Sequence, residues 1–242
     1  MPLVPFIPDI PVIESDLVNN ITERIACLLV LDGSSSMAGE PMRQLNQGLQ
    51  DFARDLKNDP TASVSVQIGV IRFGGHSEVE VLSPFTDAMN WEPPTLEANG
   101  TTPLGAAMQT ALKMLREQKD EYKKNAISYK RPWLVLMTDG EPTDDANIPK
   151  AERDTKEAIA NKGVFVLPVG CGDGADMDAL NRFVDVPARG SVQPVPAQQF
   201  KDIGSWRPFF MWLSESMAQV SSAQTGETQQ IPAPVWNIPT SV

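Results

Sequence analysis

Three oxygen-bearing side chains, Asp32, Ser34 and Ser36, alternate directly after the apolar run at residues 27–31. The run is too short to cross a membrane and has no helical spacing, so it predicts a buried strand at about residues 23–31. Open α/β sheets place their ligand sites beyond the carboxyl ends of such strands. One carboxylate and two hydroxyls are hard oxygen donors, which suit Mg²⁺ or Mn²⁺. The alternative is a serine-rich turn whose hydroxyls cap the following helix.

Two later segments carry similar side chains at comparable places in the predicted fold. Thr101 and Thr102 stand at the start of the amphipathic helix predicted at residues 103–122, and Asp139 follows the buried strand predicted at residues 132–138. Because the carboxyl ends of neighbouring parallel strands meet at one edge of a sheet, donors from separate loops can converge there. The simpler alternatives are a threonine that caps the helix and an Asp-Gly turn that ends the strand.

The remaining pattern alternates strands with helices, which is typical of a doubly wound α/β domain. A Gly-Gly turn predicts a hairpin, so one edge strand is expected to run antiparallel in a mostly parallel sheet with helices on both faces. The periodicity predicts further strands at residues 64–73, 76–82, 164–172 and 191–195, and helices at residues 41–56, 144–161, 176–183 and 197–223, the last one bent or split by Pro208.

Composition predicts one folded domain with an N-terminal arm, which either packs along the domain or is mobile, and a mobile C-terminal tail. The 242 residues are 41% hydrophobic, enough for one sizeable core. Residues 1–21 form a Pro-rich arm, residues 22–221 the domain, and residues 222–242 a polar and then Pro-rich tail. The aromatic residues of the last predicted helix could form a docking face, but their helical spacing favours core packing.

The net charge and the two cysteines indicate which binding partners and which cellular compartment to expect. A formal net charge of −11 argues against a general nucleic-acid binder, because phosphate contacts need clustered Lys and Arg. Cys27 and Cys171 lie in or near apolar runs and are expected to be buried free thiols. The first residues lack the pattern of a secretory signal, and no apolar run approaches membrane length, so we expect a cytoplasmic protein without membrane attachment.

Several enzyme classes lack their motifs here. A phosphatase of the aspartyl-nucleophile type needs Asp-x-Asp after the first strand, whereas Ser34 occupies the second position. The sequence has neither the loop G-x-x-x-x-G-K-[ST] nor a G-x-G-x-x-G after a strand, so nucleotide binding through these motifs is unsupported. The single histidine, His76, is predicted in an exposed hairpin turn, so a Ser/His/Asp hydrolase and a zinc enzyme are both unsupported.

Three motifs together resemble the von Willebrand factor A (VWA) family. They are D-x-S-x-S at residues 32–36, TTPLG at residues 101–105 and LMTDGEP at residues 136–142. The resemblance extends over roughly residues 22–220 and is closest to the bacterial tellurite-resistance-type (TerY-like) VWA proteins. Gly33 and Ser35 differ from the D-T-S-G-S of many relatives, at positions that supply no ligand.

The resemblance implies a metal-ion-dependent adhesion site (MIDAS). Its expected Mg²⁺ or Mn²⁺ ligands, direct or through water, are Asp32, Ser34, Ser36, Thr102 and Asp139. Thr101 is the second choice to Thr102, while Glu141, Asp144 and Asp145 are expected to line the rim without binding the ion. One coordination position would stay open for a carboxylate of a partner protein.

The function implied by the resemblance is that of an adaptor, not an enzyme. Tellurite-resistance-type members are associated with a kinase-like protein and a PP2C-type phosphatase in bacterial stress-response or chemical-defence modules. Two alternatives remain open at this point: a metal-dependent phosphohydrolase that uses the same pocket, and a structural VWA domain whose metal site is not functional.

Overall fold

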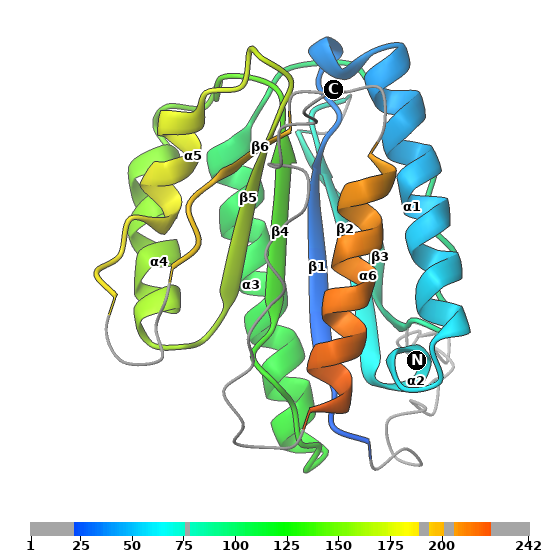
Figure 1. The fold of residues 1–242 in the computed structure, drawn as a ribbon. Helices are drawn as coiled ribbons and strands as arrows, with labels where there is room; N and C mark the ends of the chain where they lie inside the picture. The colour runs from blue at the N-terminus through cyan, green and yellow to red at the C-terminus, as the bar shows by residue number, and fades with distance from the viewer. Residues whose placement is uncertain (1–21, 76–77, 189–193, 201–205, 224–242) are drawn as a thin grey trace, which may run out of the picture.

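The computed structural model describes residues 22–75, 78–188, 194–200 and 206–223. They form an α/β domain with a six-stranded sheet in the middle (Figure 1). The elements in chain order are β1 (Ile25–Asp32), η2 (Ser35–Met37), α1 (Glu40–Asn58), α2 (Ala62–Ser65), β2 (Val66–Phe73), β3 (Val79–Asp87), α3 (Leu104–Lys124), β4 (Trp133–Thr138), α4 (Ile148–Ala160), β5 (Phe165–Cys171), α5 (Met177–Val184), β6 (Gln198–Phe200) and α6 (Arg207–Ser222).

The strand order is β3-β2-β1-β4-β5-β6. All neighbouring pairs are parallel except β2 and β3, which form the antiparallel edge. The predicted fold class is therefore confirmed. The chain leaves β1 toward β2 on one side, and β4 lies on the other side. The carboxyl ends of β1 and β4 thus flank a topological switch point, where open α/β sheets bind their ligands.

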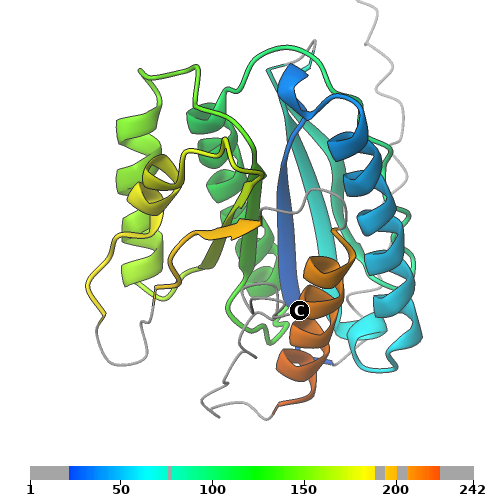
Figure 2. The same ribbon diagram turned by 45° about the horizontal axis from the view of Figure 1, so that its top comes forward.

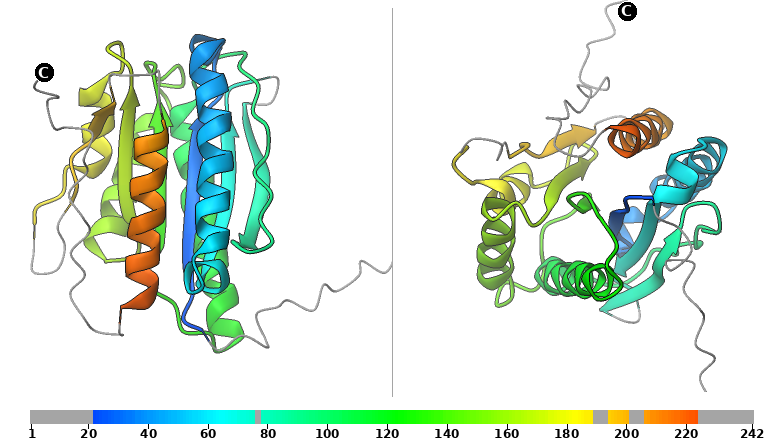
Figure 3. Two further views of the ribbon diagram at one scale, coloured as in Figure 1. Left: turned by 45° about the vertical axis from the view of Figure 1, so that its right-hand side comes forward. Right: turned by 90° about the horizontal axis from the view of Figure 1, so that it is seen from below.

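Helices cover both faces of the sheet. Helices α1 and α6 lie side by side on one face, and α3 and α4 cover the opposite face together with α5 (Figure 3). Side chains of a strand alternate between the two faces, and β1 supplies both cores. Cys27 and Leu29 pack toward α1 and α6, whereas Leu28 and Val30 pack toward α3 and α4. Because both faces are covered, β1 is fully buried and its sequence is continuously apolar up to Asp32.

The aromatic residues of α6 are core residues, as their spacing predicted. Phe209 and Phe210 are fully buried, and the Phe210 ring lies 5.8 Å from that of Phe52 on α1. Close approach of the two helices depends on Gly48 of α1, because a Cβ atom there would lie 2.3 Å from the Phe210 ring. The alternative of a docking face on these rings is therefore wrong.

Three predictions about these elements are wrong, each for a physical reason. Strand β3 continues through Pro84 to Asp87, because an edge strand tolerates a residue without an N–H group. The last strand is β6, within the range predicted as helix, and Pro194 and Val195 lie outside any strand. Pro208 does not bend α6, because it stands in the first turn, where no backbone N–H is needed.

Some predictions fall outside the described residues. They are the arm at residues 1–21, the tail beyond residue 223, the turn at His76 and the predicted strand residues 191–193. Both cysteines are buried and free, as predicted. Among the helices that the structure describes, none combines the length and the apolar character needed to cross a bilayer.

Candidate metal site at the switch point

Strand β1, drawn in blue, lies in the middle of the sheet (Figure 2). Asp32 is its last residue, and this carboxylate is buried beside the switch point. Its Oδ1 atom accepts a hydrogen bond of 2.7 Å from the backbone N–H of Ser34, and its Oδ2 atom accepts one from the hydroxyl of Thr138 on β4. Burial raises the pKa of Asp32 above its ordinary value, the two hydrogen-bond partners lower it, and nearby Asp139 raises it further. The hydrogen bonds from Ser34 and Thr138 therefore do not fully offset the cost of burying the charged Asp32 carboxylate.

A chain of hydrogen bonds joins the loop after β1 (residues 33–36, the first loop) to the loop after β4 (residues 139–145, the third loop). The hydroxyl oxygens of Ser34 and Ser36 lie 3.0 Å apart. Ser36 then donates a hydrogen bond of 2.7 Å to Oδ1 of Asp139. Four of the five predicted site residues are therefore linked through atoms that the structure places within hydrogen-bond distance.

Thr102 belongs to the segment before α3 (residues 99–103, the second loop) and faces the same cluster. Thr102 is only 6% exposed, whereas the neighbouring Thr101 is exposed. A Cβ atom on Gly140 would lie 3.5 Å from the Thr102 hydroxyl oxygen and 3.8 Å from that of Ser36. The two hydroxyls thus flank Gly140, and the structure brings Thr102 beside the other predicted residues.

Backbone contacts hold the first loop against the second. Ser35 donates from both its backbone N–H and its hydroxyl to the carbonyl oxygen of Gly100, at 3.2 and 3.1 Å. The N–H of Asn99 donates to the carbonyl of Gly33 at 2.8 Å. Gly74 stands behind them with φ +93°, and a Cβ atom there would lie 2.7 Å from the Ser34 nitrogen. Only glycine allows both this backbone conformation and this close approach.

Sequence analysis missed the roles of Thr143 and Asp144. Both carboxylate oxygens of Asp144 accept hydrogen bonds from the first turn of α3, at 2.9 Å from Gly105 N and 2.8 Å from Ala106 N. The alternative in which Thr101 or Thr102 caps the helix is wrong, because the N-cap position is Pro103, whose side chain makes no capping hydrogen bond. No sequence pattern signals this contact, since the partners lie 38 or 39 residues apart.

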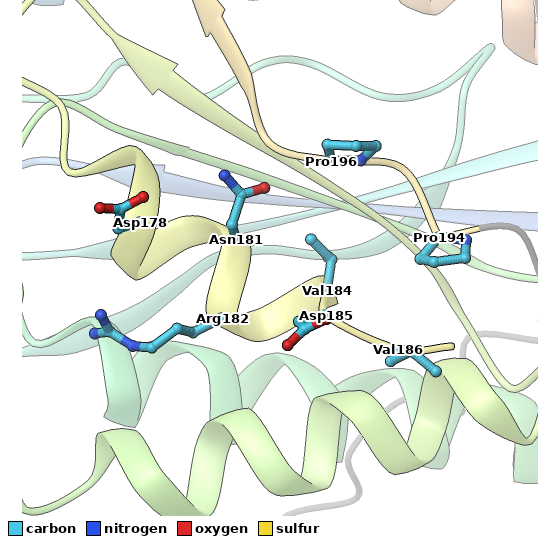
Figure 4. Close-up of a pocket in the computed structure, with 8 residues that line it drawn as sticks. All are labelled: Asp178, Asn181, Arg182, Val184, Asp185, Val186, Pro194 and Pro196. Atoms are coloured by element: carbon cyan, nitrogen blue, oxygen red, sulfur yellow. The ribbon is translucent and has the colours of Figure 1, made fainter. Parts of the chain in front are cut away.

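A cavity of about 460 Å³ lies apart from these loops, between α5 and the segment that leads into β6 (Figure 4). The side chains of Asn181, Val184 and Pro196 are among its lining, and Asn181 Oδ1 accepts a 2.8 Å hydrogen bond from the Ala197 N–H. None of the five predicted site residues lines this cavity. The cluster at the switch point is therefore separate from this cavity.

The donor set of the cluster fits a hard divalent cation. It combines two carboxylates with three hydroxyls, and all of them are oxygen donors of the kind that Mg²⁺ and Mn²⁺ prefer. In the described part of the chain, no three His, Cys, Asp or Glu side chains gather around one point. An ion at this place would therefore depend on the hydroxyls as much as on the carboxylates.

A family comparison decides the identity of the fold. The profile of the von Willebrand factor type A domain matches residues 28–204. The chain belongs to this family. Among curated proteins, this VWA domain is 26% identical over 160 residues to human (Homo sapiens) inter-alpha-trypsin inhibitor heavy chain H6, and 27% identical over 189 residues to vitrin of Mus musculus. These matches cover 64% and 69% of the chain but only 12% and 25% of the two relatives.

Solved structures show the same fold. The pilus adhesin SpaC of Lactobacillus rhamnosus GG matches with a TM-score of 0.63 at 13% identity, over 83% of this chain and 31% of SpaC. The vWF domain of the pilus tip protein Mfa5 of Porphyromonas gingivalis matches with a TM-score of 0.57 at 13% identity, over 86% and 99% of the two chains. At such identities the likeness concerns the fold, and the site rests on this chain's own residues.

Proposed function

We propose that this VWA domain is a metal-dependent protein-binding module. The ion is Mg²⁺ or Mn²⁺, held directly or through water by Asp32, Ser34, Ser36, Thr102 and Asp139. The observation that carries the proposal is the hydrogen-bonded chain from Ser34 through Ser36 to Asp139 at the switch point, with Thr102 beside it. Membership of the VWA family and the hard-oxygen donor set support it.

Binding of a partner follows from the chemistry of such a site. Three of the five donors are neutral hydroxyls. Where a carboxylate acts through water, most direct ligands are neutral, and the ion then stays electrophilic toward another anion. Mg²⁺ keeps several of its coordination positions for water or for a ligand. A carboxylate from a partner protein is the natural occupant of one of them. The proposed role is adhesion or assembly without catalysis.

A more specific context rests on the resemblance to the tellurite-resistance-type VWA proteins. In that context the protein acts in the cytoplasm of a bacterium, in a stress-response or chemical-defence module. Its partners are a kinase-like protein and a PP2C-type phosphatase, and one of them supplies the acidic side chain. The partners of the curated relatives do not define this chain's partners, because it spans a quarter or less of their length.

The test has two stages with one set of proteins. Direct binding of Mn²⁺ to the full chain is measured first, by titration calorimetry, for the wild type, for Ser34→Ala/Ser36→Ala and for the neighbouring Ser35→Ala control. Affinity capture from a native lysate is then run with each protein in Mg²⁺ and in EDTA. The proposal requires one partner that the wild type and the control retain in Mg²⁺, and that is lost in EDTA and with the double variant.

Other outcomes would remove the proposal. A wild-type chain that binds no Mn²⁺ contradicts the metal site itself. A partner that remains bound under all conditions contradicts docking through the metal. Turnover of a generic phosphatase substrate that depends on metal and disappears in Asp32→Ala would replace the adaptor by an enzyme.

A further inference from the structure

Thr143 is joined to Thr102 by two reciprocal hydrogen bonds. The Thr143 hydroxyl accepts from the backbone N–H of Thr102 at 3.0 Å, and the backbone N–H of Thr143 donates to the Thr102 carbonyl at 2.9 Å. Neither bond uses the Thr102 hydroxyl, which stays available on the side of Gly140 and Ser36. The contact therefore orients the backbone of Thr102 without occupying its side chain.

Asp144 adds a second attachment one residue further on. Its two carboxylate oxygens accept the hydrogen bonds from Gly105 and Ala106 described above, and its Oδ2 atom also lies 3.1 Å from Nδ2 of Asn147. The first turn of α3 thereby lies directly against the start of α4, where a Cβ atom on Gly105 would come within 2.8 Å of Asn147. A carboxylate at a helix N-terminus is also favoured by the helix dipole.

These contacts complete the support of the second loop. On one side, the first loop holds it through Ser35 and Gly100. On the other side, Thr143 ties it to the third loop, which also carries Asp139, and Asp144 ties the first turn of α3 to the same loop. The hydroxyl of Thr102 and the carboxylate of Asp139 come from distant parts of the chain, so their separation depends on this attachment. We call Thr143 and Asp144 the clasp.

We propose that the clasp residues Thr143 and Asp144 are positioning residues for the metal site. Thr143 holds the backbone of Thr102, and Asp144 holds the first turn of α3 that follows it, so that the Thr102 hydroxyl faces the ion together with Ser36 and Asp139. The inference rests on the proposed metal-binding function and replaces the expectation that Asp144 merely lines the rim. Residues that orient metal ligands typically change affinity by about 10- to 100-fold when they are removed.

The experiment measures Mn²⁺ affinity by titration calorimetry on the full chain. Thr143→Val removes the hydroxyl at nearly constant shape, and Thr143→Ser restores it. Asp144→Asn removes one of the two carboxylate acceptors that receive the N–H groups of α3. Its matched control is Asp145→Asn, which makes the same charge change at the next, exposed position. Unfolding in EDTA checks that each variant is folded. We expect about a tenfold loss of affinity for Thr143→Val and Asp144→Asn, near wild-type affinity for Thr143→Ser, and a smaller loss for Asp145→Asn.

A double-mutant cycle separates positioning from general structural support. If the clasp acts through the Thr102 hydroxyl, Thr143→Val causes no further loss of Mn²⁺ affinity in a Thr102→Val background. An equal fractional loss in both backgrounds would overturn the inference, as would wild-type affinity in both clasp variants. Equal losses for Asp144→Asn and Asp145→Asn would assign the effect of Asp144 to charge and overturn its positioning role. A wild type that binds no Mn²⁺ would remove the proposed function, and this inference with it.

Discussion

Ser36 and Ser35 offer a sharp test of metal binding, because they are adjacent, equally small and both exposed. The Ser36 hydroxyl lies 3.0 Å from that of Ser34 and donates to Asp139 at 2.7 Å, whereas the Ser35 hydroxyl donates to the Gly100 carbonyl at 3.1 Å. Without metal, Ser36→Ala removes an exposed hydrogen bond to Asp139 and a partly buried one to Ser34, whereas Ser35→Ala removes one exposed side-chain hydrogen bond. Each hydrogen bond lost is expected to lower the free energy of unfolding by about 0.5–1.5 kcal/mol.

With metal, the two variants are expected to differ. At a Mg²⁺ concentration 100 times Kd, the ion stabilises the wild type by about 2.7 kcal/mol. For a domain of this size that is roughly 5–11 °C in Tm, at about 2–4 °C per kcal/mol. If the loss of one ligand weakens binding about 100-fold, Ser36→Ala retains only about 0.4 kcal/mol at the same concentration. Ser35→Ala retains the full gain.

Thermal and urea unfolding in EDTA and in Mg²⁺ measure these differences directly. The informative quantity is the gain on adding metal, because it cancels the cost of each substitution in the metal-free chain. Equal gains for Ser36→Ala and Ser35→Ala would refute the assignment of Ser36 as a ligand. Absence of a gain in the wild type at every Mg²⁺ and Mn²⁺ concentration would refute the metal site.

Three further predictions concern pH, packing and the thiols. Burial raises the folded-state pKa of Asp32 above the ordinary value of 3.8. As pH rises from 3.8 through the folded-state pKa, the wild type in EDTA should therefore lose urea stability relative to Asp32→Asn. A stability difference between the two proteins that does not depend on pH would contradict this prediction. Gly48→Ala should lower the free energy of unfolding by about 1–3 kcal/mol in a urea titration, because its Cβ atom would lie 2.3 Å from a ring of α6. The control Gly174→Ala should be nearly neutral in the same titration, because no atom lies close to its Cβ position. Burial raises the pKa of Cys27 to about 12 and that of Cys171 well above its ordinary value. A thiol reagent at pH 8 should therefore react with both cysteines only after unfolding. Rapid reaction of the native chain would contradict their burial.

Some features of this fold follow from local sequence patterns, whereas others depend on contacts between distant residues. The apolar run before Asp32 identified a central strand, because burial on both faces leaves a continuous pattern that is readable without neighbours. The limits of β3 and α6 differ from those that the sequence predicts, because the effect of a proline depends on whether its missing N–H would have been needed. Pro84 stands in an edge strand and Pro208 in a first helical turn, and neither context is visible in a short window of sequence.

The same division applies to the site. Alternation of Asp32, Ser34 and Ser36 after a strand is a local pattern, so the sequence alone indicated these donors and their preference for a hard cation. Strand order brings these donors to Asp139. The clasp attaches Thr102 to the third loop through its backbone, and a backbone contact leaves no pattern of residue types in the sequence. Only the tertiary structure decided these, because a hydrogen bond between distant backbone and side-chain atoms is set by how the elements pack.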